Sequence, residues 1–216
     1  MAERLPITPQ LAQSGVVAIL RAPSDRHLGP VSRILGEAGV TCLELTLTTP
    51  GAVDALARVR AELPGDVALG MGSVIDADQA AACLDAGADF LVSPGVCADV
   101  ALYAAEHEVA CYPGGWTPTE LLEAWRLGAP AVKLFPAASG GPRHLKDVRA
   151  PLPHIPLVPT GGVGLERIGD YIVAGAVAVG LGGPLVGDAL DGGSLTALAE
   201  RARVALEAVR AGRDRR

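Results

Sequence analysis

Aromatic residues are scarce in this chain of 216 residues, since Phe, Tyr and Trp together make up only 3% of it. Charged residues are also few, at 19%, whereas half of all residues are hydrophobic. This composition excludes general disorder, because disordered chains are poor in apolar residues and rich in net charge. Glycine is abundant, with 27 residues. We therefore expect many tight turns around a core of Ala, Val, Leu and Ile, within a single domain covering residues 1–216.

The chain has no excess of positive charge, and its net charge is −6 at pH 7. Non-specific binding to nucleic acid needs a basic face that displaces counterions, so nucleic acid is not an expected partner. A membrane is not expected either, because the uncharged stretch 171–187 contains five glycines and Pro184, which favours a buried strand with its loops over a span. The start, Met1-Ala-Glu-Arg4, lacks the apolar segment of a signal peptide, and we expect a cytoplasmic protein.

Cysteine and histidine do not form a metal-binding pattern. The four cysteines, at positions 42, 83, 97 and 111, have no Cys-x-x-Cys spacing, and the four histidines do not cluster near them. A zinc site is therefore poorly supported, and we predict no metal and no other cofactor. We interpret the thiols as reduced packing residues, as expected in the cytosol.

A short pattern recurs along the chain, in which a glycine follows a helical segment and precedes an apolar run. It is found at Gly39, Gly87, Gly128 and Gly175, which are 48, 41 and 47 residues apart. Such a glycine ends a helix and leads into a buried strand. Eight apolar runs, starting about every 23 residues, are predicted as strands: Val16–Leu20, Thr41–Leu45, Val67–Gly70, Phe90–Val92, Val109–Tyr112, Ala131–Leu134, Leu157–Val158 and Val177–Gly180.

Amphipathic helical patterns fill the gaps between these runs, for example at Val53–Leu63, Ala77–Ala86 and Thr119–Leu127. Apolar strands that alternate with helices indicate a parallel sheet covered by helices. Eight such units predict an α/β fold of the closed (β/α)₈ TIM-barrel type, with a short N-terminal helix at Thr8–Ser14. An open doubly wound sheet is the alternative, disfavoured because Leu20-Arg-Ala-Pro23 has no glycine-rich dinucleotide fingerprint. Residues 210–216 are basic and polar, and we expect a frayed tail there.

Lys133 is the most informative residue, because chemistry in such a barrel takes place at the carboxyl ends of the strands. The chain has 16 arginines and two lysines, yet the one cation inside a predicted strand is a lysine. A desolvated lysine can lose its proton, which arginine cannot, and the free amine can form a Schiff base with a carbonyl. The alternative is a structural lysine that snorkels or pairs with a carboxylate.

Glu44 is the second polar residue predicted to point into the barrel. Strand alternation places Leu43 and Leu45 on one face, toward the helices, and Cys42 and Glu44 on the other. The strands of Glu44 and Lys133 are the second and sixth of eight, on opposite sides of the ring, so both side chains can approach the axis. Glu44 is a candidate general acid–base beside an amine nucleophile. The alternative is that the two residues only neutralise each other.

Glycine pairs follow the last two predicted strands, and loops at these positions are the usual phosphate-binding site of such barrels. The candidate phosphate-binding residues are Gly161, Gly162, Gly182 and Gly183. Ordinary turn glycines are the alternative. Arg21 follows the first strand and is either a bidentate carboxylate clamp or a surface cation.

The sequence resembles the class I aldolases that cleave 2-keto-3-deoxy-6-phosphogluconate (KDPG) and 4-hydroxy-2-oxoglutarate (KHG). The resemblance runs over nearly the whole chain, and its motifs keep the family's order and spacing. They are Val17-Ala-Ile-Leu-Arg21, Leu43-Glu-Leu-Thr-Leu-Thr-Thr-Pro50, Gly70-Met-Gly-Ser73, Val92-Ser-Pro-Gly95, Pro113-Gly-Gly-Trp-Thr-Pro-Thr-Glu120, Val132-Lys-Leu-Phe-Pro136, Pro159-Thr-Gly-Gly162 and Pro184-Leu-Val186. The resemblance implies a homotrimer of barrels without a metal.

The resemblance also implies roles for individual residues. It makes Lys133 the Schiff-base lysine and Glu44 the proton-transfer residue. Ser73 and Thr160 fall where the family contacts the pyruvyl carboxylate, and Phe135 falls where it lines the pocket.

Three positions depart from the family pattern. Some members carry an arginine clamp where this chain has Thr48, but others carry one at the end of the first strand, as Arg21 does here. Ser73 replaces the more usual threonine and keeps the hydroxyl. Gly183 stands where many members have a phosphate-contacting serine, which weakens the expectation of a phosphorylated substrate.

Together these residues predict a Schiff-base aldolase that cleaves a 2-keto-3-deoxy-4-hydroxy acid to pyruvate and an aldehyde, with a small keto acid as its partner. One alternative is a phosphate-binding barrel with isomerase or epimerase chemistry. Another is a non-catalytic relative that only binds keto acids.

Overall fold

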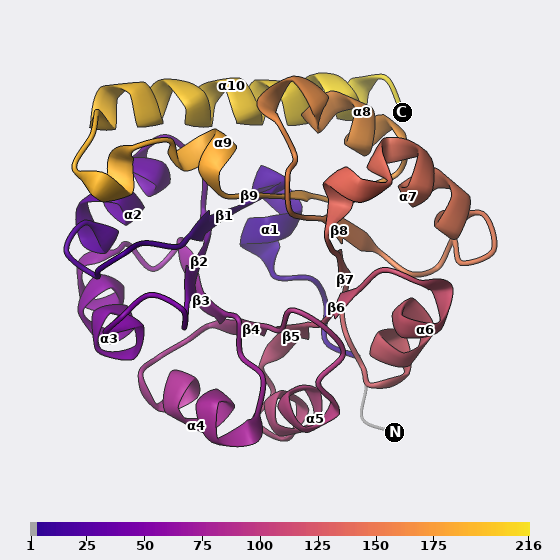
Figure 1. Cartoon of the computed structure of the whole chain (residues 1–216), viewed down its shortest axis with the longest axis horizontal. Coiled ribbons are helices and arrows are strands. Elements are labelled where there is room, and N and C mark those ends of the chain that lie inside the picture. The colour runs from indigo at the N-terminus through magenta and orange to yellow at the C-terminus, as the bar shows by residue number, and fades with distance from the viewer. Residues whose placement is uncertain (1–3) are drawn as a thin grey trace.

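The computed structural model describes residues 4–216, which form an α/β fold with a curled parallel sheet inside and helices outside (Figure 1). In this part of the chain the strands are β1 (Val16–Leu20), β2 (Cys42–Thr46), β3 (Ala68–Gly72), β4 (Phe90–Val92), β5 (Ala110–Tyr112), β6 (Gly114–Gly115), β7 (Val132–Leu134), β8 (Leu157–Pro159) and β9 (Val179–Leu181). All paired strands are parallel, as predicted. Each of the eight predicted strands is present, with its ends shifted by at most two residues, and β6 is an additional short strand.

Hydrogen bonding divides these strands into two ladders, in the orders β5-β4-β3-β2-β1-β9 and β6-β7-β8. The sequence predicted one closed ring, and the interruption between β5 and β6 has a local cause. Pro113 separates them and has no N–H to donate, although its carbonyl accepts a hydrogen bond from the Lys133 amide at 2.9 Å. At the other side, an isolated bridge joins Thr160 to Gly180. The two ladders therefore curl around a common centre (Figure 1).

Helices surround the sheet and connect its parallel strands. They are α1 (Pro9–Ser14), α2 (Leu28–Glu37), α3 (Ala52–Glu62), α4 (Ala77–Asp85), α5 (Ala98–Glu106), α6 (Pro118–Arg126), α7 (Gly141–Arg149), α8 (Ile168–Val173), α9 (Gly183–Val186) and α10 (Leu195–Asp214), with 3₁₀ turns η1 (Ala137–Ser139), η2 (Leu165–Arg167) and η3 (Ala189–Asp191). The recurring glycines end α2, α4, α6 and α8 with φ between 91° and 111°, a conformation that side-chain-bearing residues rarely adopt. The repeated pattern in the sequence is thus confirmed as a helix-to-strand junction.

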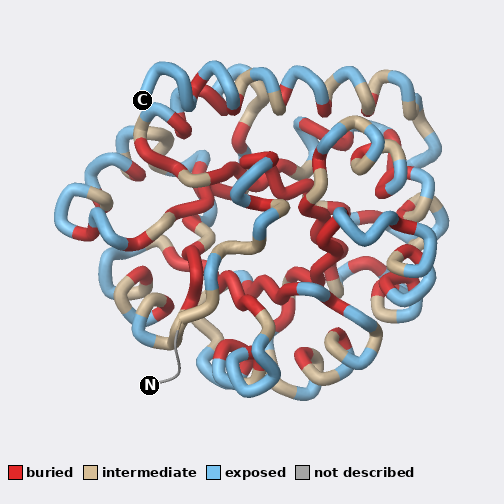
Figure 2. Tube along the Cα trace, turned by 180° about the vertical axis from the view of Figure 1, so that it is seen from behind, coloured by how far each residue is buried: buried red, intermediate tan, exposed pale blue. Residues whose placement is uncertain are grey.

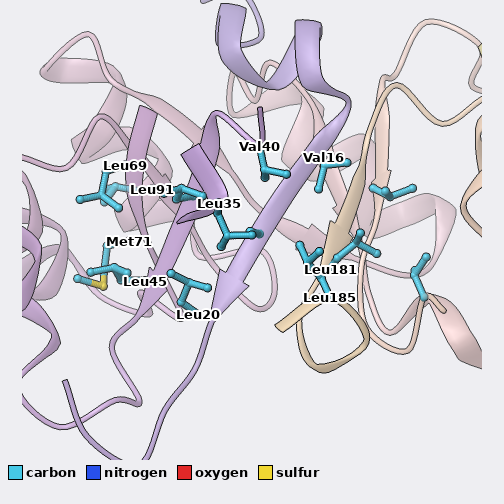
Figure 3. Packing of buried hydrophobic residues seen from close by; sticks show 14 of the residues in the cluster. Val16, Leu20, Leu35, Val40, Leu45, Leu69, Met71, Leu91, Leu181 and Leu185 are labelled. Atoms are coloured by element: carbon cyan, nitrogen blue, oxygen red, sulfur yellow. The ribbon is translucent and has the colours of Figure 1, made fainter. Parts of the chain in front are cut away.

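Two apolar clusters lie on the two faces of the sheet. The larger one fills the space between strands and helices, and Figure 3 shows part of it, including Leu20, Leu45 and Leu69. The smaller one lies inside the curl and contains Cys42, Phe90 and Tyr112 among others. Buried backbone accordingly lines the centre, with exposed segments at the periphery (Figure 2). The predicted alternation along β2 is confirmed, since the leucines on either side of Glu44 belong to the outer cluster and Cys42 to the inner one.

Helix α1 lies across one end of the curl (Figure 1). Its Leu11 is only 2% exposed and belongs to the inner cluster. Thr8, which precedes the helix, donates its backbone N–H to the Tyr112 hydroxyl at 3.0 Å and receives a hydrogen bond from it at its own hydroxyl, at 3.2 Å. These contacts fix α1 as a plug on the side where the strands begin.

The end of the chain differs from its prediction. Residues 210–216 were expected to fray, but α10 continues to Asp214. Arg213 donates hydrogen bonds to the carbonyls of Ala12 and Gln13, at 2.7 and 2.8 Å, near the end of α1. Because a free helix end offers carbonyls that cations readily bind, the basic residues anchor this segment instead of loosening it.

No helix within residues 4–216 combines the length and apolar character needed to cross a membrane. The uncharged stretch 171–187 contains the predicted buried strand, β9, but the end of α8 and the short helix α9 flank it where loops were expected. In the same part of the chain, no group of three or more His, Cys, Asp or Glu side chains is arranged to hold a metal ion.

Candidate active site

Lys133 lies in the middle of β7, between Gly114 of β6 and Val158 of β8. Its side chain is half-buried and lines an internal cavity. The six ion pairs among residues 4–216 do not include it, so no carboxylate in this range lies within 4.0 Å of its amine. The amine is therefore not bound directly by a structural carboxylate.

Glu44 lines the same cavity from β2 and is only 2% exposed. Burial raises the pKa of its carboxyl group, and the nearby cations Lys133 and Arg21 partly oppose that rise. Its carboxylate has no hydrogen-bond partner among residues 4–216. A buried acid that is free to exchange a proton, beside an amine, is suited to proton transfer.

The cavity that Glu44 and Lys133 share is otherwise mostly apolar. Its remaining lining residues are Leu11, Val17, Cys42, Phe90, Val92, Tyr112, Val158 and Thr160. Its enclosed volume is about 20 Å³, which suits a single water molecule. The apolar walls keep bulk water away from Glu44 and limit its access to the half-buried Lys133, and this strengthens electrostatic interactions between them and any bound reactant.

Gly72, at the end of β3, leaves room for the Glu44 side chain. A Cβ atom at this position would lie 1.9 Å from Oε1 and 2.5 Å from Cδ of Glu44. We expect Gly72→Ala to displace the carboxylate while leaving the strand in place, and to lower kcat by up to about 10²-fold. Steady-state kinetics alongside a thermal melt would measure this. An unchanged kcat in a folded variant would show that the position of the carboxylate does not matter.

Arg21 and Ser73 meet at the rim, where β1 and β3 end. The Arg21 guanidinium lies 3.5 Å from the Ser73 hydroxyl, and its side chain is exposed. Ser73 has a φ of 64°, in the left-handed region that is uncommon for residues other than glycine. Strained backbone of this kind is often found at functional sites. The structure thus brings these two predicted carboxylate-binding residues together.

Phe135 and Thr160 lie on the opposite rim, at the ends of β7 and β8. The Phe135 ring centroid is 5.2 Å from Nζ of Lys133. The ring also packs on Gly161, where a Cβ atom would lie 2.8 Å from it. Thr160 is 3% exposed and donates its hydroxyl to the Val158 carbonyl at 3.2 Å. Both residues are thus beside the lysine.

The two glycine pairs follow neighbouring strands, since Thr160 pairs with Gly180. Gly161 and Gly162 have φ values of 90° and 73°, and Gly183 begins α9. The amide N–H groups of the four predicted glycines have no acceptor within the described chain. A Cβ atom at Gly183 would meet nothing within 4 Å, so a serine side chain would fit at this position.

Comparison with known proteins assigns the family. A sequence model described as KDPG and KHG aldolase matches residues 7–199. This chain belongs to the KDPG and KHG aldolase family. Aldolases are carbon–carbon lyases, so the chain is an enzyme of that class.

Individual members of the family resemble this aldolase over nearly its whole length. A 2-dehydro-3-deoxy-phosphogluconate aldolase of Pseudomonas aeruginosa is 34% identical over 197 residues, 90% of this chain and 89% of the relative. The KHG/KDPG aldolase of Escherichia coli K12 is 33% identical over 199 residues, 91% and 93% of the two chains. The crystal structure of KDPG aldolase from Legionella pneumophila matches with a TM-score of 0.84 and 28% identity, covering 91% and 96% of the two chains. That protein holds pyruvate captured at low pH as a covalent carbinolamine intermediate.

Sequence reasoning did not identify two threonines at the rim of the site, where the strands end. Thr46 and Thr49, at and after the end of β2, are buried and form a cluster of hydroxyl groups next to Arg21. The sequence did contain an indication of this cluster, because three threonines fall at a strand end in Thr46-Leu-Thr-Thr49. The sequence alone drew attention only to Thr48, as a position where some relatives carry arginine.

Proposed function

We propose that this aldolase uses Lys133 as a Schiff-base nucleophile to cleave a 2-keto-3-deoxy-4-hydroxy acid into pyruvate and an aldehyde. The observation that carries the proposal is that Lys133 and Glu44, from β7 and β2, line one mostly apolar cavity without forming a direct ion pair.

Lys133 supplies the electron sink of the proposed reaction. Its amine attacks the C2 carbonyl, and loss of water from the carbinolamine gives an iminium ion. When the C3–C4 bond breaks, its electron pair moves toward the iminium nitrogen and leaves an enamine. Protonation at C3 and hydrolysis then release pyruvate and the free lysine. The proposed route needs no metal or other cofactor, because the iminium accepts the electrons.

Glu44 moves the protons of this reaction. As a carboxylate it accepts the proton of the C4 hydroxyl, so that this oxygen becomes the carbonyl of the aldehyde product. As an acid it returns a proton during formation and breakdown of the carbinolamine. Burial raises the pKa of Glu44 above that of an ordinary carboxyl group, which favours the protonated form that delivers a proton. A water molecule in the cavity is suited to relay protons between Glu44 and the reacting atoms.

Arg21, Ser73 and Thr160 bind the carboxylate of the keto acid, with Phe135 as the wall beside it. A guanidinium binds a planar carboxylate through two parallel hydrogen bonds, which fixes orientation as well as position. The Ser73 hydroxyl adds a donor from one rim, and the Thr160 hydroxyl adds one from the other when it rotates away from the Val158 carbonyl. A substrate held in this way presents its C2 carbon to the lysine amine.

Gly161, Gly162, Gly182 and Gly183 hold the distal end of the substrate. Their unused N–H groups favour an anionic tail, such as a phosphate or a second carboxylate. These four glycines supply no side-chain donor, so we expect a lower affinity for phosphate than a serine at position 183 would give.

Family membership also supports proposals on the closure of the barrel, the oligomeric state and the cellular compartment. We propose that the two ladders are parts of one closed (β/α)₈ barrel. Two observations support this: only Pro113 separates β5 from β6, and a bridge joins Thr160 to Gly180. We also propose a homotrimer, which sedimentation would test. Four free cysteines support a reducing, cytoplasmic setting.

A direct assay tests the proposed reaction. Coupled to lactate dehydrogenase, the purified enzyme should release pyruvate from a panel of phosphorylated and unphosphorylated 2-keto-3-deoxy-4-hydroxy acids. Relative kcat/KM across the panel would identify the tail that the glycine turns prefer. Absence of pyruvate from every member of the panel would refute the proposed function, and isomerised product without pyruvate would point to epimerase chemistry.

A further inference from the structure

The backbone around Arg21 is held by buried hydroxyl groups from the end of β2. Thr49 Oγ1 accepts a hydrogen bond from the Ala22 amide at 3.0 Å, and Thr46 Oγ1 lies 3.5 Å from the Leu20 carbonyl. The two threonines thus contact the residue before Arg21 and the residue after it.

These hydroxyls form one rigid cluster. Thr46 and Thr49 are 0% and 1% exposed, and their Oγ1 atoms are 3.4 Å apart. The Thr49 amide also donates to the Thr46 carbonyl at 2.9 Å, which closes a tight turn. Thr48 adds a third hydroxyl, 3.1 Å from that of Thr46. Buried and mutually bonded groups of this kind have little freedom to move.

The Arg21 side chain, by contrast, has little support of its own. It is exposed, and its only hydrogen bond within the described residues is the 3.5 Å contact with Ser73. None of the ion pairs in this range includes it. The backbone sets the point and the Cα–Cβ direction from which such a flexible side chain starts, and thus the region its guanidinium can reach. Here that backbone is fixed by the threonines.

We propose that Thr49, supported by Thr46, is a positioning residue that holds the backbone of Arg21 so that its guanidinium is aligned to bind the carboxylate of the keto acid. The inference rests on the proposed function, because it assumes that Arg21 binds this carboxylate. Thr49 itself is buried and acts only through its neighbour.

Thr49→Val tests the proposal, because valine has the shape of threonine and lacks the hydroxyl. We expect KM for the keto acid to rise about tenfold while kcat changes little. A loss of affinity of about tenfold is typical when one charge-assisted hydrogen bond is misaligned. Thr49→Ser should restore the wild-type KM. Thr41→Val is the matched control and should leave KM unchanged. Thr41 immediately precedes β2, at the end far from Arg21, and its hydroxyl contacts the Gln10 carbonyl.

The same substitution in an Arg21→Gln background separates positioning from a merely structural role. Arg21→Gln alone should raise KM, and adding Thr49→Val should then change KM by less than about twofold, because the group it positions is gone. An equal rise of KM in both backgrounds would overturn the proposal. So would an unchanged KM in Thr49→Val when Arg21→Gln does raise it.

Failure of the underlying function would look different. If Arg21→Gln leaves KM unchanged, both the carboxylate role of Arg21 and this inference are refuted. Absence of pyruvate release in the wild type would refute the function itself.

Should Thr49→Val not fold, which a thermal melt would show, Thr46→Val is the substitute variant. It removes the contact with the Leu20 carbonyl and keeps the bond to Ala22. It should then give a smaller rise in KM that again disappears in the Arg21→Gln background, and no rise would overturn the proposal.

Discussion

Replacing Lys133 with arginine should leave the fold intact and lower turnover by roughly 10³-fold or more. Arginine keeps the positive charge and comparable length, but it stays protonated and cannot form the imine. The expected loss is therefore one of chemistry and not of charge. It would be measured as kcat for pyruvate release, with a thermal melt to verify folding.

Lys146 provides the control for this experiment, as the only other lysine in the chain. It is exposed on α7, and Lys146→Arg should keep full activity. Borohydride added with pyruvate should label the wild type at Lys133, as read by peptide mass spectrometry, and should leave Lys133→Arg unlabelled. Full activity in Lys133→Arg, or a wild type labelled elsewhere, would refute the imine route.

Glu44→Gln should lower kcat by about 10²–10⁴-fold while leaving imine formation detectable by borohydride trapping. Glutamine keeps the size of the side chain but can neither accept nor deliver the proton at C4. Steady-state kinetics over a range of pH would measure the effect. A variant that retained the wild-type kcat would remove Glu44 from the proton transfers.

The same variant should be more stable than the wild type at neutral pH. Burial raises the pKa of Glu44 in the folded state, so folding favours its protonated form. The stability associated with the neutral acid is present below the ordinary carboxyl pKa and is lost as pH rises through the raised value. The gain in melting temperature from Glu44→Gln should therefore grow with pH across this window. A gain that was independent of pH would contradict this account.

The elements of the fold could be predicted from the sequence because their signals are local. The apolar runs and the glycines after α2, α4, α6 and α8 depend on few neighbours, and they placed eight strands within two residues. The division into two ladders was not predicted, because it depends on the missing N–H of Pro113 at one side and on the single bridge between Thr160 and Gly180 at the other. The prediction of a frayed tail was wrong because the contacts of Arg213 with the end of α1 join residues about 200 positions apart.

The site was predictable only where strand geometry determines the direction of a side chain. The alternation of side chains along β2 was sufficient to predict that Glu44 points into the barrel. The position of Lys133 in β7 places its side chain at the same cavity. The Arg21–Ser73 contact was not predictable from the residues alone, since it depends on the left-handed backbone of Ser73 and on the path of the β1–α2 loop. The hydroxyl cluster of Thr46 and Thr49 was missed for the same reason, because its partners Leu20 and Ala22 lie at the end of β1 and in the loop after it.

The plug formed by α1 has a consequence for the order of events in catalysis. Leu11 of α1 lines the cavity on the side where the strands begin, so in the proposed reaction the substrate approaches from the opposite side, where Arg21 and Phe135 follow the ends of β1 and β7. After cleavage, the aldehyde occupies the outer position and the three-carbon fragment is still attached to the inner one. The proposed imine at Lys133 therefore predicts that the aldehyde departs first and pyruvate last, and that in the synthetic direction the keto acid is loaded before its acceptor.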